Sequence, residues 1–534
     1  MIRFSSFGFR YEPNSPWIVR DLDVEVLDGE LLVVIGPTGS GKSTVLRAID
    51  GLIPHFSGGE MLGDVTIAGY SIREATPTDL AGIVGYVGQN PVQSFVTDRV
   101  EDEIAYAMEN LGITAVTMRR RVEDVLDVLN LHEVRNEQLR SLSGGQQQRV
   151  AIAAVLAASP RVLVLDEPTS ALDPGSAEEV LSALTRLVHD VGLTVVIAEH
   201  RLERVLPFAD RVMALTPEGV TLGRPADIME HSRIAPPIVE LGRIAQWKPL
   251  PVSVREARRM AGPLVERLAP LRPPPALAVT GSTVATMNVV SLRYGQTPAL
   301  VDVSWDLAGG TITALMGRNG SGKTSLLNLL SGMRAPSTGT LLVDGHDPKS
   351  MKASERIASV GLVPQDPGTL LYCQSVAQEC ETADREHGLA AGSTWAELEK
   401  LDAILEASRH PRDLSEGQRL QLALAVVLAA RPDLLLLDEP TRGLDYEAKW
   451  SLCCQLTGLR DQGVAILLST HDVELAASIA DHTVVLAGGE IIAGGETRDV
   501  VRQTPAFAPQ VSKVLSPEPW LSVHEIRAAL EASS

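Results

Sequence analysis

The chain has 534 residues, enough for two or more domains that each bury a core of their own. Its formal net charge of -20 argues against a protein that coats nucleic acid, because such proteins present a basic surface. All four cysteines lie in the second half without C-x-x-C spacing, which argues against a zinc site and against a disulfide framework.

The N-terminal residues and the apolar runs give no sign of a membrane anchor. Residues 1–5 lack the cationic start and the long apolar stretch of a secretory signal. The longest apolar runs, at 150–158 and 422–430, are well short of the roughly 18 residues that suggest a membrane span. We therefore expect a cytosolic protein that acts on a membrane only through partners.

The first motif is a glycine-rich loop at residues 36–43, Gly-Pro-Thr-Gly-Ser-Gly-Lys-Ser, which fits G-x-x-x-x-G-K-[ST]. An apolar run at 31–35 predicts a strand before it, and residues 44–49 have a helical pattern after it. In such a loop backbone N–H groups surround phosphates, Lys42 reaches the β/γ oxygens and Ser43 holds Mg²⁺. The segment predicts a nucleotide site, although glycine-rich turns before helices are also common.

Two later strands are followed by polar residues. The run 162–165 predicts a buried parallel strand that leads into Asp166 and Glu167, and an apolar stretch at 195–198 precedes His200. The aspartate can hold Mg²⁺ through its water shell, and the glutamate can orient an attacking water. The alternatives are a solvated turn or helix cap for the acidic pair, and a structural role for the histidine.

The second half repeats this series in the same order. Its loop at 317–324, Gly-Arg-Asn-Gly-Ser-Gly-Lys-Thr, again lies between a strand-like run and a helical pattern. Residues 252–258 are echoed at 521–527, so the repeating unit includes a tail, and a proline hinge at 273–275 follows the first tail. The recurring pairs are Tyr11 and Tyr294, Lys42 and Lys323, Gln89 and Gln365, Asp166 and Asp438, Glu167 and Glu439, and His200 and His471. The sequence therefore predicts a nucleotide-binding protein built by duplication.

Two further segments name a family: residues 142–146, Leu-Ser-Gly-Gly-Gln, and residues 414–418, Leu-Ser-Glu-Gly-Gln. With both glycine-rich loops and both Leu-Asp-Glu-Pro segments, they make nearly the whole chain resemble the ATPase subunits of ABC transporters. The resemblance implies an α/β fold of two tandem P-loop NTPase (ABC ATPase) domains, each with a RecA-like core and a helical subdomain. The expected parts are a first ABC ATPase domain at 1–242, a tail and proline-rich linker at 243–283, a second domain at 284–505, and a tail at 506–534 with helical periodicity over 520–532.

The resemblance also implies roles for the recurring residues, with ATP and Mg²⁺ as cofactors. The expected catalytic residues are Glu167, Glu439, His200 and His471, the histidines as contacts to the γ-phosphate. The expected metal ligands are Ser43, Gln89, Asp166, Thr324, Gln365 and Asp438. Tyr11 and Tyr294 are expected to stack on adenine, with ordinary strand tyrosines as the alternative. For the two glutamines, the alternative is a turn-forming polar residue.

The residues expected to bind the nucleotide form one set in each half. They are Tyr11, Gly36, Pro37, Thr38, Gly39, Ser40, Gly41, Lys42, Ser43, Thr44, Gln89, Ser143, Gly144, Gly145 and Gln146 in the first half, and Tyr294, Gly317, Arg318, Asn319, Gly320, Ser321, Gly322, Lys323, Thr324, Ser325, Gln365, Ser415, Gly417 and Gln418 in the second.

The signature segments are expected to differ in their effect. In the family two nucleotide domains pair head to tail, so ATP at Lys323 would meet residues 142–146, and ATP at Lys42 would meet the second signature. Glu416 stands there in place of Gly144, and a carboxylate near a triphosphate is repelled unless it points away or pairs with a cation. We therefore expect two competent but unequal sites.

A finer resemblance points to importers of the energy-coupling factor type. The segments that carry it are 49–59, 89–106, 198–201, 414–418 and 441–445. It implies an ATP-hydrolysing motor, a translocase at the cytoplasmic face of the membrane, for a vitamin, a vitamin precursor or a transition-metal ion. The implied partners are an integral membrane T-type subunit and a small substrate-binding membrane subunit, with no nucleic acid.

The alternative is a soluble ATPase of the ABC-F type, which acts on ribosomes. Such proteins carry a long, charged helical linker between their halves, and residues 243–283 hold seven basic residues against two acidic ones. Prolines interrupt that segment, however, and much of it recurs in the C-terminal tail. A fused sugar-importer ATPase is a third possibility, weakened because both halves keep the full hydrolytic set.

Overall fold

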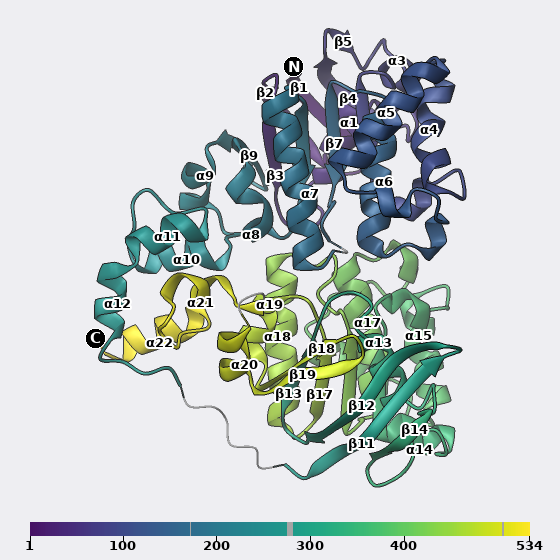
Figure 1. Ribbon diagram of the computed structural model, residues 1–534, viewed down its shortest axis with the longest axis vertical. Helices are drawn as coiled ribbons and strands as arrows, with labels where there is room; N and C mark the ends of the chain where they lie inside the picture. The colour runs from purple at the N-terminus through teal and green to yellow at the C-terminus, as the bar shows by residue number, and fades with distance from the viewer. Residues whose placement is uncertain (171, 275–280, 505–506, 534) are drawn as a thin grey trace. The chain divides into compact units, whose positions relative to one another are not determined.

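The computed structural model spans residues 1–534 and describes all of them except 171, 275–280, 505–506 and 534 (Figure 1). The chain divides into two units, Met1–Ala257 and Arg258–Ser534, called unit 1 and unit 2 below. The division falls inside the segment 243–283, in a seven-residue helix, α11 (Val254–Met260).

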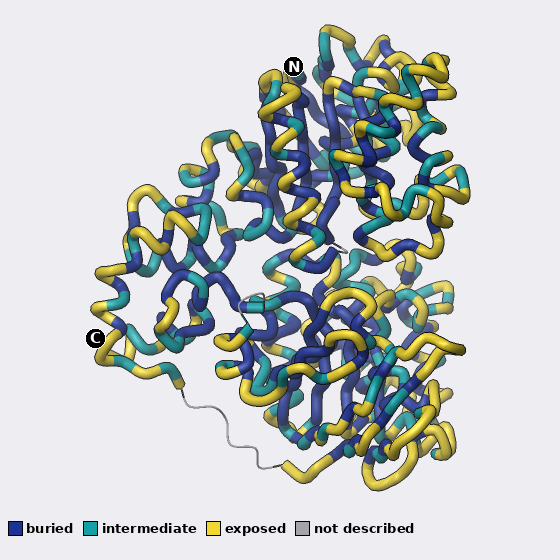
Figure 2. Tube along the Cα trace, in the orientation of Figure 1, coloured by how far each residue is buried: buried dark blue, intermediate teal, exposed yellow. Residues whose placement is uncertain are grey.

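Unit 1 is centred on a six-stranded sheet with five parallel strands and one antiparallel edge strand. Its strand order is β10 (Gly219–Gly223), β9 (Arg211–Thr216), β3 (Leu31–Ile35), β8 (Thr194–Ala198), β7 (Val162–Asp166) and β6 (Val84–Val87). Every residue of β3, β7 and β8 is buried, as the continuous apolar runs predict for strands covered on both faces (Figure 2).

A second, antiparallel sheet packs against this core. Its order is β2 (Val19–Val26), β1 (Ile2–Arg10), β4 (Glu60–Ile67) and β5 (Tyr70–Ser71). Phe4 and Phe7 of β1 meet edge to face at 5.6 Å and belong to one apolar cluster with Leu46 and Ile49 of the helix after the loop. This cluster fixes the helix, and with it the glycine-rich loop, between the two sheets.

The helices of unit 1 include three, α4, α5 and α6, that pack on one another as a separate helical layer. The helices are α1 (Lys42–Ile49), α2 (Leu52–His55), α3 (Pro77–Leu80), α4 (Val100–Asn110), α5 (Ala115–Val128), α6 (Gly144–Ala157), α7 (Pro174–Arg186), α8 (Leu202–Val205), α9 (Pro225–His231), α10 (Pro237–Ile244) and α11. Short 3₁₀ turns lie at Pro91–Ser94, His132–Val134, Leu139–Ser141 and Leu206–Phe208, and a π turn at Leu187–Val191.

Unit 2 repeats this plan. Its six-stranded sheet runs β15 (Val360–Val363), β16 (Leu434–Asp438), β17 (Ala465–Ser469), β13 (Ile312–Met316), β18 (His482–Ala487) and β19 (Glu490–Glu496), and its antiparallel sheet runs β12 (Thr297–Ala308), β11 (Thr283–Tyr294) and β14 (Thr338–Val343). The positions of β13, β16 and β17 match those of β3, β7 and β8, and all of their residues are buried.

The helices of unit 2 include a matching layer, in which α15, α16 and α17 pack together. They are α12 (Gly262–Leu268), α13 (Lys323–Leu330), α14 (Ala353–Ser359), α15 (Val376–Glu386), α16 (Ser393–Lys400), α17 (Glu416–Leu428), α18 (Tyr446–Asp461), α19 (Val473–Ile479), α20 (Thr497–Gln503), α21 (Gln510–Leu515) and α22 (Val523–Ala532), with 3₁₀ turns at Pro367–Leu370 and Pro411–Asp413. The predicted α/β class with two tandem P-loop domains is confirmed.

In the ranges 1–170, 172–274, 281–504 and 507–533, no helix combines the length and the apolar character that crossing a membrane requires.

Candidate active sites

The glycine-rich loop of unit 1 joins β3 to α1 and is held by its own lysine. Lys42 is buried, and its Nζ donates hydrogen bonds to the carbonyl oxygens of Gly36 at 2.9 Å and Pro37 at 3.1 Å. A Cβ atom on Gly36 would lie 2.4 Å from Ser40 Oγ, so the tight turn requires glycine there. In unit 2, Lys323 makes the same bonds to Gly317 at 2.8 Å and Arg318 at 3.3 Å.

Several groups around each loop fit a phosphate ligand. No side chain caps the N-terminus of α1 or of α13, so the first N–H groups of both helices are available to an anion. Ser40 Oγ and Ser321 Oγ are buried and have no hydrogen-bond partner among the described residues. A bound phosphate would supply acceptors for these donors and a counter-charge for the buried lysine.

A hydroxyl and a carboxylate lie together beside each loop, where Mg²⁺ would be expected. Asp166 is hydrogen-bonded to Ser43, and Thr324 Oγ1 donates to Asp438 Oδ2 at 2.8 Å. Burial raises the pKa of both aspartates, although these hydrogen bonds act in the opposite direction. Oxygen ligands suit Mg²⁺, and a cation there would favour the charged carboxylate, so the residues present fit the ion.

Glu167 of unit 1 contacts both a glutamine and a histidine. Its Oε2 accepts a hydrogen bond from Gln89 Nε2 at 3.0 Å, and its Oε1 lies 3.1 Å from His200 Nε2. Burial acts to raise the pKa of Glu167, but the hydrogen bond from His200 and the charge of Lys42 outweigh it, so the pKa lies below its ordinary value. An ionised carboxylate in this position can orient or deprotonate a water.

Glu439 of unit 2 has different neighbours. Its Oε2 lies 2.7 Å from His471 Nδ1 and accepts a hydrogen bond from the His471 backbone N–H at 3.3 Å, while Lys323 Nζ is 4.0 Å from Oε1. The two histidines thus face their glutamates with different ring nitrogens. In the part of the chain that the structure describes, the Gln365 side chain makes no hydrogen bond, unlike Gln89.

The two tyrosines lie at the ends of β1 and β11. Tyr11 Oη is 3.4 Å from both Thr44 Oγ1 and the Arg47 guanidinium, which places the ring beside the start of α1. Tyr294 is 42 % exposed, and the Arg334 guanidinium lies over its ring at 5.4 Å from the centroid. Arginine is thus in contact with the tyrosine in both units.

The signature serines lie at helix N-termini, and within the described residues neither one is hydrogen-bonded to the glycine-rich loop of its own unit. Ser143 caps α6 and Ser415 caps α17, each in a reciprocal capping box with the glutamine three residues later. Each hydroxyl accepts a backbone N–H, which leaves its own proton to donate. Glu416 forms an ion pair with Arg419 at 3.2 Å, so the unusual carboxylate has the cation that its position was expected to need.

The structure also shows residues next to the candidate sites that the sequence motifs did not predict. Glu199 and Arg204 bond to the segment that follows Glu167, as described below, and Arg47 is hydrogen-bonded to Tyr11 and Tyr86. A comparison of the two halves of the sequence could have identified Glu199 and Arg204, because the corresponding residues in the second half are Thr470 and Leu475. Residues that differ inside otherwise matching motifs mark where the two sites diverge.

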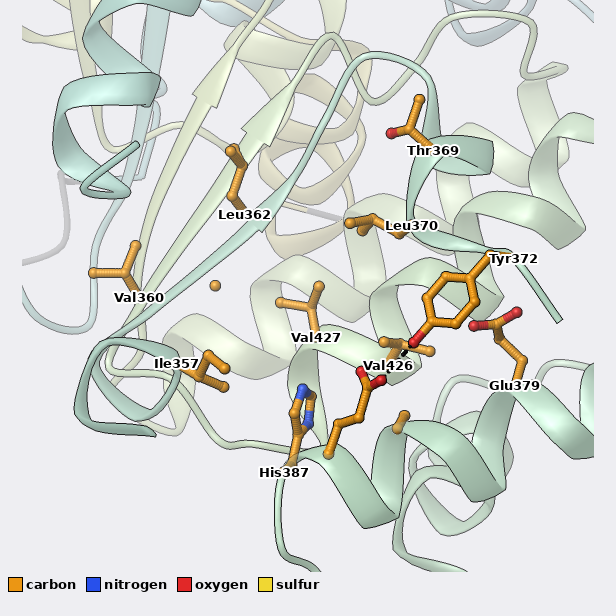
Figure 3. Close-up of a pocket in the computed structure, with 13 residues that line it drawn as sticks. Ile357, Val360, Leu362, Thr369, Leu370, Tyr372, Glu379, His387, Val426 and Val427 are labelled. Atoms are coloured by element: carbon orange, nitrogen blue, oxygen red, sulfur yellow. Dashed lines mark hydrogen bonds between the residues drawn. The ribbon is translucent and has the colours of Figure 1, made fainter. Parts of the chain in front are cut away.

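A cavity of about 300 Å³ lies apart from these constellations in unit 2 (Figure 3). Its apolar wall includes Leu362 and Val427, and its polar wall includes Tyr372, which donates a hydrogen bond to Glu386 at 2.8 Å, and His387. None of the predicted site residues lines this cavity.

Both units of the chain match a known protein family. The model of the family described as "ABC transporter" matches residues 19–170 and 300–442. A "Putative ABC transporter ATP-binding protein" of Streptomyces avermitilis is 50 % identical over 99 % of this chain and 100 % of its own length. One with the same name from Methanosarcina mazei is 33 % identical over 94 % of this chain and 90 % of its own.

Two solved structures match most of the chain. A model of ribosome-bound archaeal Pelota and ABCE1 matches with a TM-score of 0.65 and 21 % identity, over 94 % of this chain and 80 % of that one. The archaeal ribosome recycling factor aABCE1, in complex with the ribosomal stalk protein aP1, matches with 0.61 and 20 % over 93 % and 91 %. At this identity the likeness concerns the fold.

One expectation is corrected by these matches. The partner set drawn from the sequence consisted of a T-type membrane subunit and a small substrate-binding membrane subunit, without nucleic acid. The solved structures that resemble nearly the whole chain are instead those of archaeal ABCE1, one in complex with the ribosomal stalk protein aP1 and one bound to the ribosome. Motifs that bind ATP are shared by all these proteins, so they do not specify which partner the ATPase contacts.

Proposed function

Because the chain belongs to the ABC transporter family, we propose that both of its units bind ATP with Mg²⁺, that both hydrolyse it, and that hydrolysis energises transport of a solute. The observation that carries the proposal is the same constellation in both units. A buried loop lysine, a hydroxyl–aspartate pair, and a glutamate within 3.1 Å of a histidine recur at the ends of matching strands.

In this proposal the chain's own residues divide the work of phosphoryl transfer. Lys42 and the N-terminus of α1 hold the phosphates, while Ser43 and Asp166 would hold Mg²⁺, which would neutralise negative charge on the phosphates. Glu167, ionised by its neighbours, orients the attacking water and can take its proton. His200, which contacts Glu167, is placed to sense whether the γ-phosphate is present. Unit 2 uses the corresponding residues.

The finer form of the proposal is an importer of the energy-coupling factor type, with the chain at the cytoplasmic face of the membrane. The support is that relatives of 50 % and 33 % identity, which match over most of the chain, are named for ABC transport. The linker also supports it: α11 and α12 have seven residues each, and between α10 and residue 274 the structure contains no long helix of the kind that ABC-F proteins insert between their halves.

A ribosome-associated ATPase is the second candidate. The specific observation that favours it is the match to ABCE1 structures along more than nine-tenths of the chain. In those structures ABCE1 is in complex with a ribosomal stalk protein or is bound to the ribosome, and the importer form does not require partners of this kind.

Cell fractionation with a trapped variant separates the two. The Glu167→Gln/Glu439→Gln double variant should bind ATP without turning it over, and the Lys42→Ala/Lys323→Ala variant is the matched control that should not bind it. ATP-dependent recovery of the trapped variant with washed membranes supports the transport form. Recovery with sucrose-gradient ribosome fractions supports the second candidate and contradicts the first.

A further inference from the structure

The same threonine follows the acidic pair in both units, but its hydroxyl has a partner in only one of them. Thr169 and Thr441 each stand two residues after the glutamate, and both are buried. The Thr169 hydroxyl donates a short hydrogen bond to Glu199. The Thr441 hydroxyl has no hydrogen-bond partner among the described residues. A buried hydroxyl without a partner is uncommon, so the difference between Thr169 and Thr441 calls for a structural explanation.

In unit 1 the partner of the threonine hydroxyl is Glu199. The side chain is 2 % exposed and accepts hydrogen bonds from the Thr169 backbone N–H at 2.9 Å and from the Thr169 hydroxyl. It also accepts the backbone N–H groups of His200 at 2.9 Å and Arg201 at 3.3 Å. Every partner is a donor, which suits an ionised carboxylate because that group only accepts.

Arg204 of α8 binds the same segment through backbone carbonyl groups. Its Nη1 donates to the carbonyl oxygens of Thr169 at 2.8 Å and Leu172 at 3.3 Å. The segment after Glu167 is therefore tied to the segment that carries His200 through both its N–H and its C=O groups.

Among the described residues of unit 2, neither tie is present. Thr470 replaces Glu199, and its hydroxyl accepts only the Asp472 N–H, at 2.9 Å. Leu475 stands where unit 1 has Arg204. The backbone N–H of His471 bonds instead to Glu439. In unit 1, then, Glu199 takes a backbone donor that in unit 2 goes to the glutamate expected to handle water.

We propose that Glu199 is a positioning residue that locks the segment after Glu167 to the histidine segment in unit 1, so that the two ATP sites respond unequally. By bonding to Thr169 and to the backbone of His200, Glu199 holds the His200 ring toward Glu167. The Glu167 carboxylate is then contacted by that ring and by the side chain of Gln89. The proposal rests on the proposed hydrolysis of ATP in both units.

The test uses the full chain and two independent readouts. Glu199→Gln keeps the size of the side chain but introduces an N–H₂ group that faces donors, and Thr169→Val removes one of the bonds. Thr441→Val is the matched control, because its hydroxyl has no bond to lose. Hydrogen–deuterium exchange reads the lock directly, and steady-state ATP turnover reads its consequence.

For Glu199→Gln we expect the amides of Thr169 and His200 to exchange about tenfold faster or more, since hydrogen bonds to a charged group are lost. The matching peptides around Thr441 and His471 should exchange as in the parent. We expect the rate at the site of unit 1 to fall about tenfold, which lowers the total kcat by the share that this site contributes, with KM for ATP within about twofold, because a supporting side chain orients a catalytic one. Thr169→Val should act in the same direction, and Thr441→Val should change neither readout.

Unchanged exchange in Glu199→Gln would overturn the lock, and unchanged kcat would overturn its effect on the site. A fall in kcat that Thr441→Val matches would overturn the assignment to unit 1. A parent protein without ATP turnover would contradict the proposed function instead, and the exchange measurement would still decide whether the lock exists.

Discussion

The side-chain amide of Gln89 donates a hydrogen bond to Glu167 Oε2 at 3.0 Å, which connects the loop after β6 to the end of β7. The bond stabilises the charged form of the carboxylate and contributes to its lowered pKa. Movement of the Gln89 loop would therefore change the basicity of Glu167 directly. Gln365 makes no such bond to a described residue, so this connection distinguishes unit 1 from unit 2.

Replacing Gln89 with alanine should raise the pKa of Glu167. A lowered carboxyl pKa means that the charged form is retained until the pH falls below the ordinary value of 4.5, so the variant should lose its charge, and its turnover, at a higher pH than the parent. The measurement is ATP turnover as a function of pH at saturating ATP. Gln365→Ala is the control, and an equal displacement of its acid limb would show that the bond in unit 1 has no special role.

Single Glu→Gln variants should leave unequal residual activities. Each removes a candidate base, which in general contributes about a hundredfold or more to the rate of its own site. The two glutamates have different partners, Gln89 and His200 for Glu167 but His471 and Lys323 for Glu439, so the remaining sites should not be equivalent. Phosphate release in Glu167→Gln and Glu439→Gln measures this. Equal residual turnover in the two variants would contradict the predicted inequality of the two sites. Full activity in either variant would show that its glutamate does not have the proposed role.

Asp50, at the C-terminus of α1, should make the stability of unit 1 depend on pH. Burial raises the pKa of Asp50 from its ordinary value of 3.8 to about 7. Because the folded state then holds the proton more tightly than the unfolded state, stability is greatest below pH 3.8 as far as this group is concerned and is lost as the pH rises toward 7. Such a shift corresponds to about 4 kcal/mol at most, and partial exposure of the side chain reduces it to about 2 kcal/mol.

Asp50→Asn should therefore raise the free energy of unfolding at pH 8 and make it less dependent on pH between 4 and 7. Urea unfolding at several pH values, monitored in unit 1, provides the measurement. The matched control is Ser331→Asn, at the corresponding C-terminus of α13, which should leave the pH dependence as it is. An unchanged pH profile in Asp50→Asn would mean that Asp50 is charged in the folded protein.

The sequence patterns predicted those elements that are determined by residues close together in the chain. Continuous apolar runs predicted buried strands at 162–165 and 434–437, and they form β7 and β16. The helical periodicity of 520–532 corresponds to α22. Glycine spacing predicted the loop around Lys42, because its tight backbone excludes a Cβ at Gly36.

What the patterns could not predict depends on contacts between distant segments. Thr169 and Glu199 are both ordinary residues of their segments, and only the pairing of β7 with β8 brings them together. The ring nitrogen that faces the glutamate also differs between His200 and His471, and the sequence around the two histidines does not predict this difference. The partner prediction was wrong for a different reason, since it was drawn from ATP-binding motifs, and such motifs do not specify a partner.

The ion pair of Glu416 and Arg419 provides the last prediction, which tests the expectation from the sequence that the second signature segment contacts a nucleotide. Arg419 neutralises Glu416 at 3.2 Å and also donates to the Leu414 carbonyl oxygen at 3.2 Å. Without that cation the carboxylate should repel a triphosphate, so Arg419→Ala should raise the KM for ATP by about threefold to tenfold, the size of one partly screened charge interaction. Stability should change by no more than about 1 kcal/mol, because the pair is near the surface.

Two further variants separate charge from packing at this position. Arg419→Lys keeps the cation while it loses the fork of donors, and it should retain most of the ATP affinity of the parent. The double variant Arg419→Ala/Glu416→Gly restores the residue found at Gly144 in the first signature and should bring KM back toward the parent value. If Arg419→Ala leaves KM unchanged at low ionic strength, the Glu416 carboxylate is remote from any bound nucleotide and the second signature does not contact it. If the double variant fails to recover, the loss in Arg419→Ala comes from the missing bond to Leu414, because the repelling charge is no longer present.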